Sequence, residues 1–365
     1  MIETNLTLKE VAVHLKVSLS TVRRLIRNGE LQSFRIGTQG QVRVPESAVM
    51  RMCGAAAHVT QEPELEATVP MVMRERAEVR VLSGVTQKEL RWSILQADVN
   101  AAAAMLPAES VNCVVTSPPY YWQRDYEVDG QIGHESSIDG YVDALVGVFS
   151  KVKKALTPDG TLFLNLGDTY YSAKGKPHGV DDKHKGRNMM RKHLRAVDGP
   201  GLGLPRKSLI GIPWRVALAM QEDGWTLRSS VIWQRPGTLP EPTAHDRPWR
   251  THENVFIFSK GPRYYFNRQG LQGEEDVWKI IARPENPGSH FAPYPRELVD
   301  RCLALGCPEG GTALDPFAGS GTTMVSALAS GRQAVGIELK PEYADFAAKR
   351  IKKEFGDLAT LRDAA

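Results

Sequence analysis

Short apolar runs separated by turns recur between residues 91 and 352 and predict the layers of an α/β protein. The runs are aliphatic and β-branched, which is typical of strands buried on both faces of a parallel sheet. Segments with apolar residues at helical spacing lie between them, and this alternation predicts a doubly wound, Rossmann-like sheet. The predicted strands are 92–95, 111–115, 161–166, 227–233, 254–260, 264–266, 312–314 and 333–338. The predicted helices are 101–106, 139–152, 212–220, 296–305, 324–329 and 341–352.

The first 51 residues have a different pattern, which predicts a small helix-turn-helix domain with a wing. Thr7 and Glu10 form a capping box, with a hydroxyl at the N-cap and a carboxylate three residues later. Apolar residues at helical spacing follow, and a second apolar face begins at Val22 after a break. Two short alternating segments, 34–37 and 41–44, predict a hairpin.

Residues 52–90 lack a sustained period and carry scattered alanine, proline and charged residues, with a short strand expected near 79–82. They are predicted to be a linker. The predicted domains are therefore a winged helix-turn-helix over 1–51, the linker, and an α/β domain over 91–365 with a basic insertion at about 171–210.

The amino-acid composition is typical of a globular protein and argues against membrane-spanning and secreted classes. Of the 365 residues, 42% are hydrophobic and 24% are charged, and no apolar run approaches the roughly 20 residues that span a bilayer. No secretory signal is visible, so a cytoplasmic protein without membrane contact is expected. The four cysteines form no C-x-x-C pair and no zinc pattern with histidine, so reduced thiols and no metal site are predicted. The net charge of +4 is compatible with a nucleic-acid partner.

Residues 315–323, with the sequence DPFAGSGTT, place a glycine turn between a predicted strand and a predicted helix. Ligands bind at such turns because they lie at the carboxyl ends of parallel strands. Gly319 and Gly321 allow the backbone to bend sharply and to approach a ligand closely. The dinucleotide fingerprint is excluded because Met324 stands where its third glycine would be, and the loop has no lysine for a P-loop.

A second motif follows the strand 111–115. Ser117, Pro118, Pro119 and Tyr120 begin immediately after it, and two prolines cannot continue a sheet ladder. They form a rigid platform that holds Ser117 and Tyr120 at the end of the strand.

Together the two motifs resemble those of β-class DNA amino-methyltransferases, which carry S-P-P-Y and D-P-F-x-G-S-G-T-T in this permuted order. The resemblance covers residues 91–352. It implies transfer of a methyl group from S-adenosylmethionine to the exocyclic amine of a flipped base. Ser117 Oγ and the Pro118 carbonyl would accept the amine protons, and Tyr120 would stack on the base.

The resemblance also assigns the cofactor side. Glu338, at the end of a strand, would accept the ribose hydroxyls, as acidic residues do in dinucleotide folds. The predicted cofactor-binding residues are Asp315, Phe317, Gly319, Ser320, Gly321, Thr322, Glu338 and Phe291.

In the family that these motifs resemble, serine at the first motif position goes mostly with cytosine N4. The resemblance therefore favours cytosine N4 as the target, and adenine N6 is the alternative. Cytosine C5 chemistry needs a Pro-Cys nucleophile, whereas this chain has the reverse order, Cys307-Pro308. A helix-turn-helix regulator with a vestigial enzyme domain is a second hypothesis, against which the intact Ser117 motif argues. An RNA or protein methyltransferase is a third.

The N-terminal domain resembles excisionase and MerR-like proteins, which insert their second helix into the major groove. Double-stranded DNA is the predicted partner, although a small helical interaction domain with a solvated basic face would show the same pattern. Restriction-modification is the expected context, with a cognate restriction nuclease and self-association left open. The predicted DNA-binding residues are Arg23, Arg24, Arg27, Lys183, Lys185, Arg187, Arg247 and Arg250.

Overall fold

The computed structural model describes residues 4–15, 17, 22, 25–26, 29–36, 41–54, 79–126, 128, 130–173, 195–238, 241, 245–271, 276–282 and 294–357. The chain divides into two compact units, Met1–Arg76 and Ala77–Ala365.

The first unit contains the helix α1 (Leu8–Leu15), the helix α3 (Glu46–Gly54) and a small antiparallel sheet. Its strands are β1 (Asn5–Leu6), β3 (Gln41–Pro45) and β2 (Phe34–Ile36), in that spatial order. The capping box forms as predicted, because the Thr7 N–H donates to Glu10 Oε2 at 2.7 Å and the Glu10 N–H donates to Thr7 Oγ1 at 3.3 Å. Pairing of β2 with β3 confirms the predicted hairpin.

The helix α3 was not predicted, and it extends the unit past residue 51 to Gly54. Ala48 and Val49 on α3 are buried in a core that also contains Val11, Val22 and Val44. This helix is short, and its apolar face consists of only Ala48, Val49 and the partly buried Met52.

Within the described residues, nine strands of the second unit form one sheet, in the order β10-β8-β9-β7-β6-β11-β12-β5-β4. The strands are β4 (Arg80–Val85), β5 (Arg91–Gln96), β6 (Val111–Thr116), β7 (Leu156–Leu166), β8 (Thr226–Gln234), β9 (His252–Ser259), β10 (Val277–Lys279), β11 (Thr312–Asp315) and β12 (Gln333–Glu338). The five central strands β7, β6, β11, β12 and β5 run parallel, whereas β9 runs antiparallel to β7 and β8. The sheet is therefore mixed, with a parallel centre as predicted.

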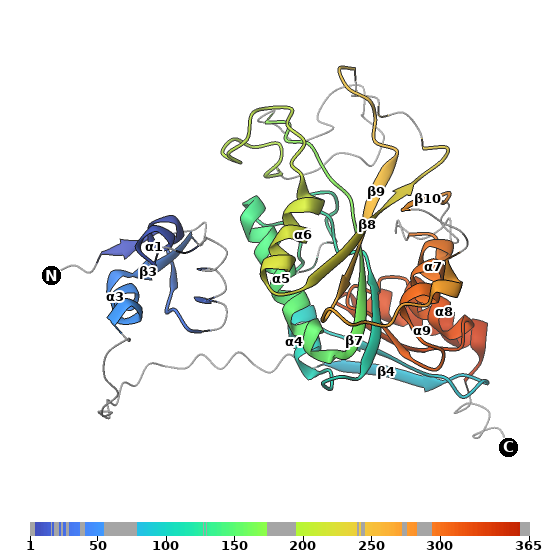
Figure 1. Cartoon of the computed structure of the whole chain (residues 1–365). Coiled ribbons are helices and arrows are strands. Elements are labelled where there is room, and N and C mark those ends of the chain that lie inside the picture. Colours follow the sequence, from blue (N-terminus) through green and yellow to red (C-terminus); the bar gives the residue numbers. More distant parts are fainter. Residues whose placement is uncertain are drawn as a thin grey trace, which may run out of the picture. The chain divides into compact units, whose positions relative to one another are not determined.

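Helices cover both faces of this sheet (Figure 1). One face carries α4 (Val99–Met105), α5 (Ile138–Ala155) and α6 (Ile212–Glu222), and the other carries α7 (Arg296–Gly306), α8 (Thr322–Ala329) and α9 (Pro341–Phe355). Two separate apolar cores lie between the sheet and these layers. The doubly wound architecture is confirmed.

Two predicted segments differ from the structure. The short strand expected near 79–82 forms as the edge strand β4, which lies inside the range predicted as linker and pairs with β5 along its whole length. The α/β unit therefore begins before residue 91; the exposed outer positions of an edge strand weakened the sequence signal. Residues 264–266 are not a strand, although the Tyr265 N–H donates to the Asp159 carbonyl.

The permuted order of the motifs leaves the two motif-bearing strands adjacent. β6 precedes β11 by almost 200 residues, yet Cys113 pairs with Ala313 and Val114 with Leu314 in parallel register. Both motifs therefore follow the carboxyl ends of two adjacent parallel strands, on the same side of the sheet.

Candidate functional site

Asp315 joins the ends of β6 and β11. Thr116 Oγ1 donates to Asp315 Oδ1 at 2.7 Å, and the Phe317 N–H donates to the same oxygen at 3.0 Å. The other oxygen accepts from Tyr294 Oη at 2.7 Å and from Thr323 Oγ1 at 2.6 Å. Burial raises the pKa of this carboxyl, against the effect of these donors. Asp315 therefore shapes the glycine turn from inside the protein.

The glycine turn itself is tied to the next strand. Gly319 has a φ of +52°, and its N–H donates to Glu338 Oε2 at 2.8 Å. The Lys340 N–H donates to Glu338 Oε1 at 2.9 Å, so each carboxylate oxygen holds one backbone group. Gly321 has a φ of +78°, and a Cβ on it would lie 2.9 Å from the Ala347 Cβ, so a side chain there would meet α9. Desolvation raises the pKa of Glu338.

The Ser-Pro-Pro-Tyr platform is fixed by hydrogen bonds at both ends. Tyr141 Oη on α5 donates to the Pro119 carbonyl at 2.8 Å, whereas within the described residues nothing donates to the Pro118 carbonyl. Ser117 Oγ donates to Tyr120 Oη at 3.1 Å. Gly167 lies against the Tyr120 ring, since a Cβ there would be 2.5 Å from a ring carbon. The platform thus has a defined orientation relative to β7.

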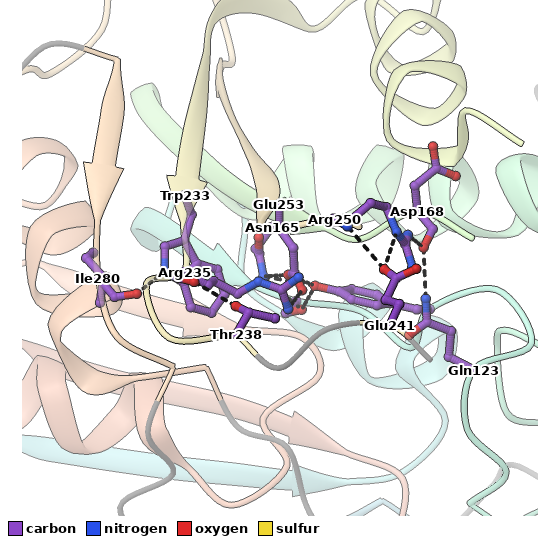
Figure 2. Close-up of polar contacts among 12 residues, drawn as sticks. Gln123, Asn165, Asp168, Trp233, Arg235, Thr238, Glu241, Arg250, Glu253 and Ile280 are labelled. Atoms are coloured by element: carbon purple, nitrogen blue, oxygen red, sulfur yellow. Dashed lines mark hydrogen bonds and ion pairs between the residues drawn. The ribbon is translucent and has the colours of Figure 1, made fainter. Parts of the chain in front are cut away.

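A polar cluster surrounds Tyr120. Its other members are Asn165, Arg235 and Glu253, none of which was predicted as a site residue from the sequence. Tyr120 Oη donates to Glu253 Oε2 at 2.6 Å, and Asn165 Nδ2 donates to Tyr120 Oη at 2.9 Å and to Glu253 Oε2 at 3.0 Å. Arg235 pairs with Glu253 Oε1 at 2.8 Å (Figure 2). Asn165 lies on β7, Glu253 lies on β9 and Arg235 directly follows β8, so their approach depends on the antiparallel pairing. Burial, and then the Glu253 charge, raise the pKa of Tyr120.

Residues of both motifs line one cavity of about 450 Å³. This volume is within the range of small-molecule binding sites. Ser117 and Tyr120 line one part of it, and Gly319 and Glu338 line another. The two peptides that the sequence places almost 200 residues apart therefore share one site. The predicted residues that line it are Ser117, Pro118, Pro119, Tyr120, Asp315, Phe317, Gly319, Ser320, Thr322 and Glu338.

Asp168, after β7, stabilises a turn rather than lining this cavity. Its carboxylate accepts from the N–H groups of Gly211 and Ile212 at the start of α6, and from Thr169. Gln123 donates to its carbonyl at 3.1 Å (Figure 2). Of the two roles open from the sequence, the geometry favours the turn.

Arg247 and Arg250 contact Glu241 and an aromatic ring. Glu241 accepts from both guanidinium groups. Arg250 also donates to the Asp168 carbonyl (Figure 2). The Arg247 guanidinium carbon lies 3.8 Å from the centroid of the Tyr170 ring. The arginines do not line the cavity, and contact with DNA stays a prediction.

Several predicted residues lie outside the described residues. They are Phe291, Arg23, Arg24, Arg27, Lys183, Lys185 and Arg187, the last three within the predicted basic insertion.

Cys307 has the properties of a structural thiol. It is fully buried, and burial raises its pKa to about 11. The Arg332 guanidinium donates to its carbonyl at 2.7 Å. A thiol in this state is a poor nucleophile, which agrees with the exclusion of a Pro-Cys chemistry.

Comparisons with known proteins agree with this geometry. Residues 111–350 match a DNA methylase family of N6 and N4 type, and residues 6–52 match a helix-turn-helix domain. The type II methyltransferase M.Cfr9I of Citrobacter freundii is 40% identical over 314 residues, which cover 83% of this chain and 99% of that protein. M.SmaI of Serratia marcescens is 44% identical over 269 residues, covering 71% and 90%.

A solved structure shows the same fold. The PvuII DNA methyltransferase, named as cytosine-N4-specific, superposes with a TM-score of 0.54 at 23% identity, over 74% of this chain and 90% of that one. The resemblance inferred from the two motifs is thereby confirmed. Since the family match spans more than half of the sequence, the chain belongs to the N6/N4 DNA methylase family.

Proposed function

We propose that the chain transfers a methyl group from S-adenosylmethionine to the N4 amine of a cytosine flipped out of duplex DNA. The observation that carries this proposal is the shared cavity, into which Ser117 and the Gly319 turn both open.

The residues of the turn fit the cofactor. Glu338 keeps acceptor capacity after binding two backbone N–H groups, because a carboxylate offers about four lone-pair sites. It would hold the ribose hydroxyls, and the left-handed glycines would let the backbone lie close to the methionine part. The cofactor supplies an electrophilic methyl group on a sulfonium.

The residues of the platform fit an exocyclic amine. Such an amine is a poor nucleophile because its lone pair is delocalised into the ring, so positioning supplies much of the rate. Ser117 Oγ and the Pro118 carbonyl would accept its two protons, and the carbonyl of Pro119 is already engaged by Tyr141. Tyr120 would present its ring to the flipped base.

Cytosine N4 is favoured over adenine N6 by Ser117 at the first motif position, and the fold neighbour named above is cytosine-N4-specific. The two amines need the same acceptors, so adenine N6 is the alternative outcome of the test. The helix-turn-helix unit would position the enzyme on DNA through Arg23, Arg24 and Arg27. A cognate restriction nuclease is part of this proposal, because the relatives are named as type II methyltransferases.

Mass spectrometry of host DNA tests the proposal directly. DNA from cells expressing the chain is digested to nucleosides, and N4-methylcytosine is expected above the level in cells expressing Ser117→Ala. N6-methyladenine alone would transfer the proposal to the alternative base. The absence of both modified nucleosides would reject the methylation of DNA.

A further inference from the structure

A chain of hydrogen bonds leads away from Ser117 in one direction. Glu253 pairs with Arg235, and an ionised carboxylate can only accept hydrogen bonds. Tyr120 must therefore use its single proton toward Glu253, at 2.6 Å. Ser117 must in turn use its proton toward the Tyr120 oxygen, at 3.1 Å. Ser117 Oγ also accepts from Asn165 Nδ2 at 3.5 Å, and its remaining lone pair is the acceptor that faces the cavity.

Asn165 fixes the orientation of this chain. Its Nδ2 donates to both Tyr120 Oη and Glu253 Oε2, and the side chain is only 5% exposed. Rotation of the amide would place Oδ1 against the Glu253 carboxylate, which is repulsive. The amide is therefore held with its donor toward the relay, and neither Tyr120 nor Glu253 can turn without breaking three polar contacts.

We infer that Glu253 is the terminal proton acceptor of the methyl-transfer step, reached through the hydroxyls of Ser117 and Tyr120. This inference rests on the proposed function. Methylation of an amine releases one proton, and a serine hydroxyl alone is far too weak a base to keep it. A carboxylate two hydrogen bonds away supplies the missing base without touching the substrate.

The amine nitrogen forms a bond to the methyl carbon as the carbon–sulfur bond breaks and its electron pair stays on sulfur. One amine proton passes to Ser117 Oγ, the serine proton passes to Tyr120 Oη, and the phenol proton passes to Glu253 Oε2. Each hydroxyl receives one proton and gives one up, so both are still protonated after the step. Glu253 is 13% exposed and lines the cavity, so it can return the proton to water.

Glu253 has one charged and one titratable neighbour in this cluster. The charged group facing it is the Arg235 guanidinium at the end of β8, and the titratable group is the Tyr120 phenol that follows β6. From β7 it meets the uncharged amide of Asn165. The pKa of Tyr120 is raised by burial and by Glu253, so the phenol stays protonated and passes a proton on rather than keeping a charge.

Single-turnover methylation of duplex DNA, measured from pH 5 to 9, tests the relay in Glu253→Gln and Tyr120→Phe. Each variant should lose about 10² to 10⁴ in rate, the usual contribution of acid–base catalysis. The double variant should be no slower than the slower single variant, because both changes break one relay. The dependence of the rate on pH should differ between wild type and Glu253→Gln, because the variant lacks the carboxylate that accepts the proton.

Matched controls separate the relay from structural damage. Glu297→Gln removes a carboxylate from a surface pair on α7, and Tyr264→Phe removes a phenol hydroxyl outside the cavity; both should keep the wild-type rate and pH profile. Calorimetry with S-adenosylmethionine shows whether each variant is folded. A Glu253→Gln variant within a factor of about ten of wild type, with the same pH profile, would overturn the relay alone. A wild-type protein that methylates no DNA would overturn the proposed function, and the relay with it.

Discussion

Thr116 Oγ1 donates a 2.7 Å hydrogen bond to Asp315 Oδ1, although 199 residues separate the two in sequence. Thr116 is the last residue of β6, immediately before Ser117, and Asp315 is the last residue of β11, at the start of the glycine turn. One bond between adjacent parallel strands therefore fixes the two halves of the site relative to each other. The order of the motifs along the chain does not matter to this contact.

Replacing Thr116 should affect stability and cofactor binding together. Thr116→Val keeps the shape of the side chain but leaves Asp315 Oδ1 with one donor fewer in a fully buried place. The expected loss is about 1–3 kcal/mol of unfolding free energy, together with weaker S-adenosylmethionine binding by calorimetry. Thr116→Ser keeps the hydroxyl and should keep both properties close to wild type. Equal behaviour of the two variants would show that the hydroxyl has no such role.

A methyl group at Gly321 should be poorly tolerated. The position has a φ of +78°, and the added Cβ would lie 2.9 Å from the Ala347 Cβ on α9. Gly321→Ala is expected to lose about 1–3 kcal/mol in urea unfolding, from backbone strain and the close contact. Gly147→Ala is the matched control, because that glycine lies inside α5 with open space around it. The control should gain up to about 1 kcal/mol.

The sequence predicted the parts of the site that depend on local backbone geometry. Ser117 and Gly319 were found because a strand that ends in prolines or glycines can only turn, and such turns meet at one edge of a parallel sheet. The carboxylate of Asp315 accepts four hydrogen bonds from the protein, and Asp315 also lines the shared cavity, so its contact with the cofactor stays a prediction.

The cluster around Tyr120 could not be predicted in the same way. Asn165 and Glu253 are 88 residues apart, and they meet only because β9 lies antiparallel beside β7. No local pattern specifies which residue of β9 faces the platform, since one step in register would turn Glu253 to the other face of the sheet. Arg235 is likewise brought to Glu253 by the pairing of β8 with β9.

Glu338 should make stability depend on pH. Burial raises the pKa of its carboxyl above the unfolded value of about 4, so the folded state binds its proton more tightly than the unfolded state does. Stability from this group is therefore greatest below the unfolded pKa and falls as pH rises toward the folded pKa. The pKa values of Asp315 and Asp168 are also raised by burial and act in the same direction.

Urea unfolding between pH 4 and 7 checks this sign. Glu338→Gln should lower stability near pH 4, where one backbone N–H loses its acceptor, and should show a shallower fall toward pH 7 than wild type. Glu354→Gln removes a partly exposed carboxylate that pairs with Arg296 on the surface, and should leave the wild-type slope unchanged. A slope for Glu338→Gln as steep as that of wild type would contradict the assignment.

Arg247 and Arg250 should contribute to DNA affinity through phosphate contacts. Glu241 holds both guanidinium groups, and Arg247 stacks on Tyr170, so the pair is ordered before DNA arrives. Each phosphate contact releases about one counterion. Arg247→Ala and Arg250→Ala should therefore each reduce the slope of log affinity against log salt by about one.

Fluorescence anisotropy with labelled duplex DNA, titrated at several salt concentrations, measures this slope. Arg301→Ala is the matched control, because that arginine pairs with Glu297 on α7 and should leave the slope at the wild-type value. If the arginines served only the ion pair with Glu241, their replacement would lower the melting temperature and leave the slope unchanged. A reduced slope at an unchanged melting temperature would instead place both guanidinium groups on the DNA backbone, because counterion release depends on phosphate neutralisation and not on the stability of the fold.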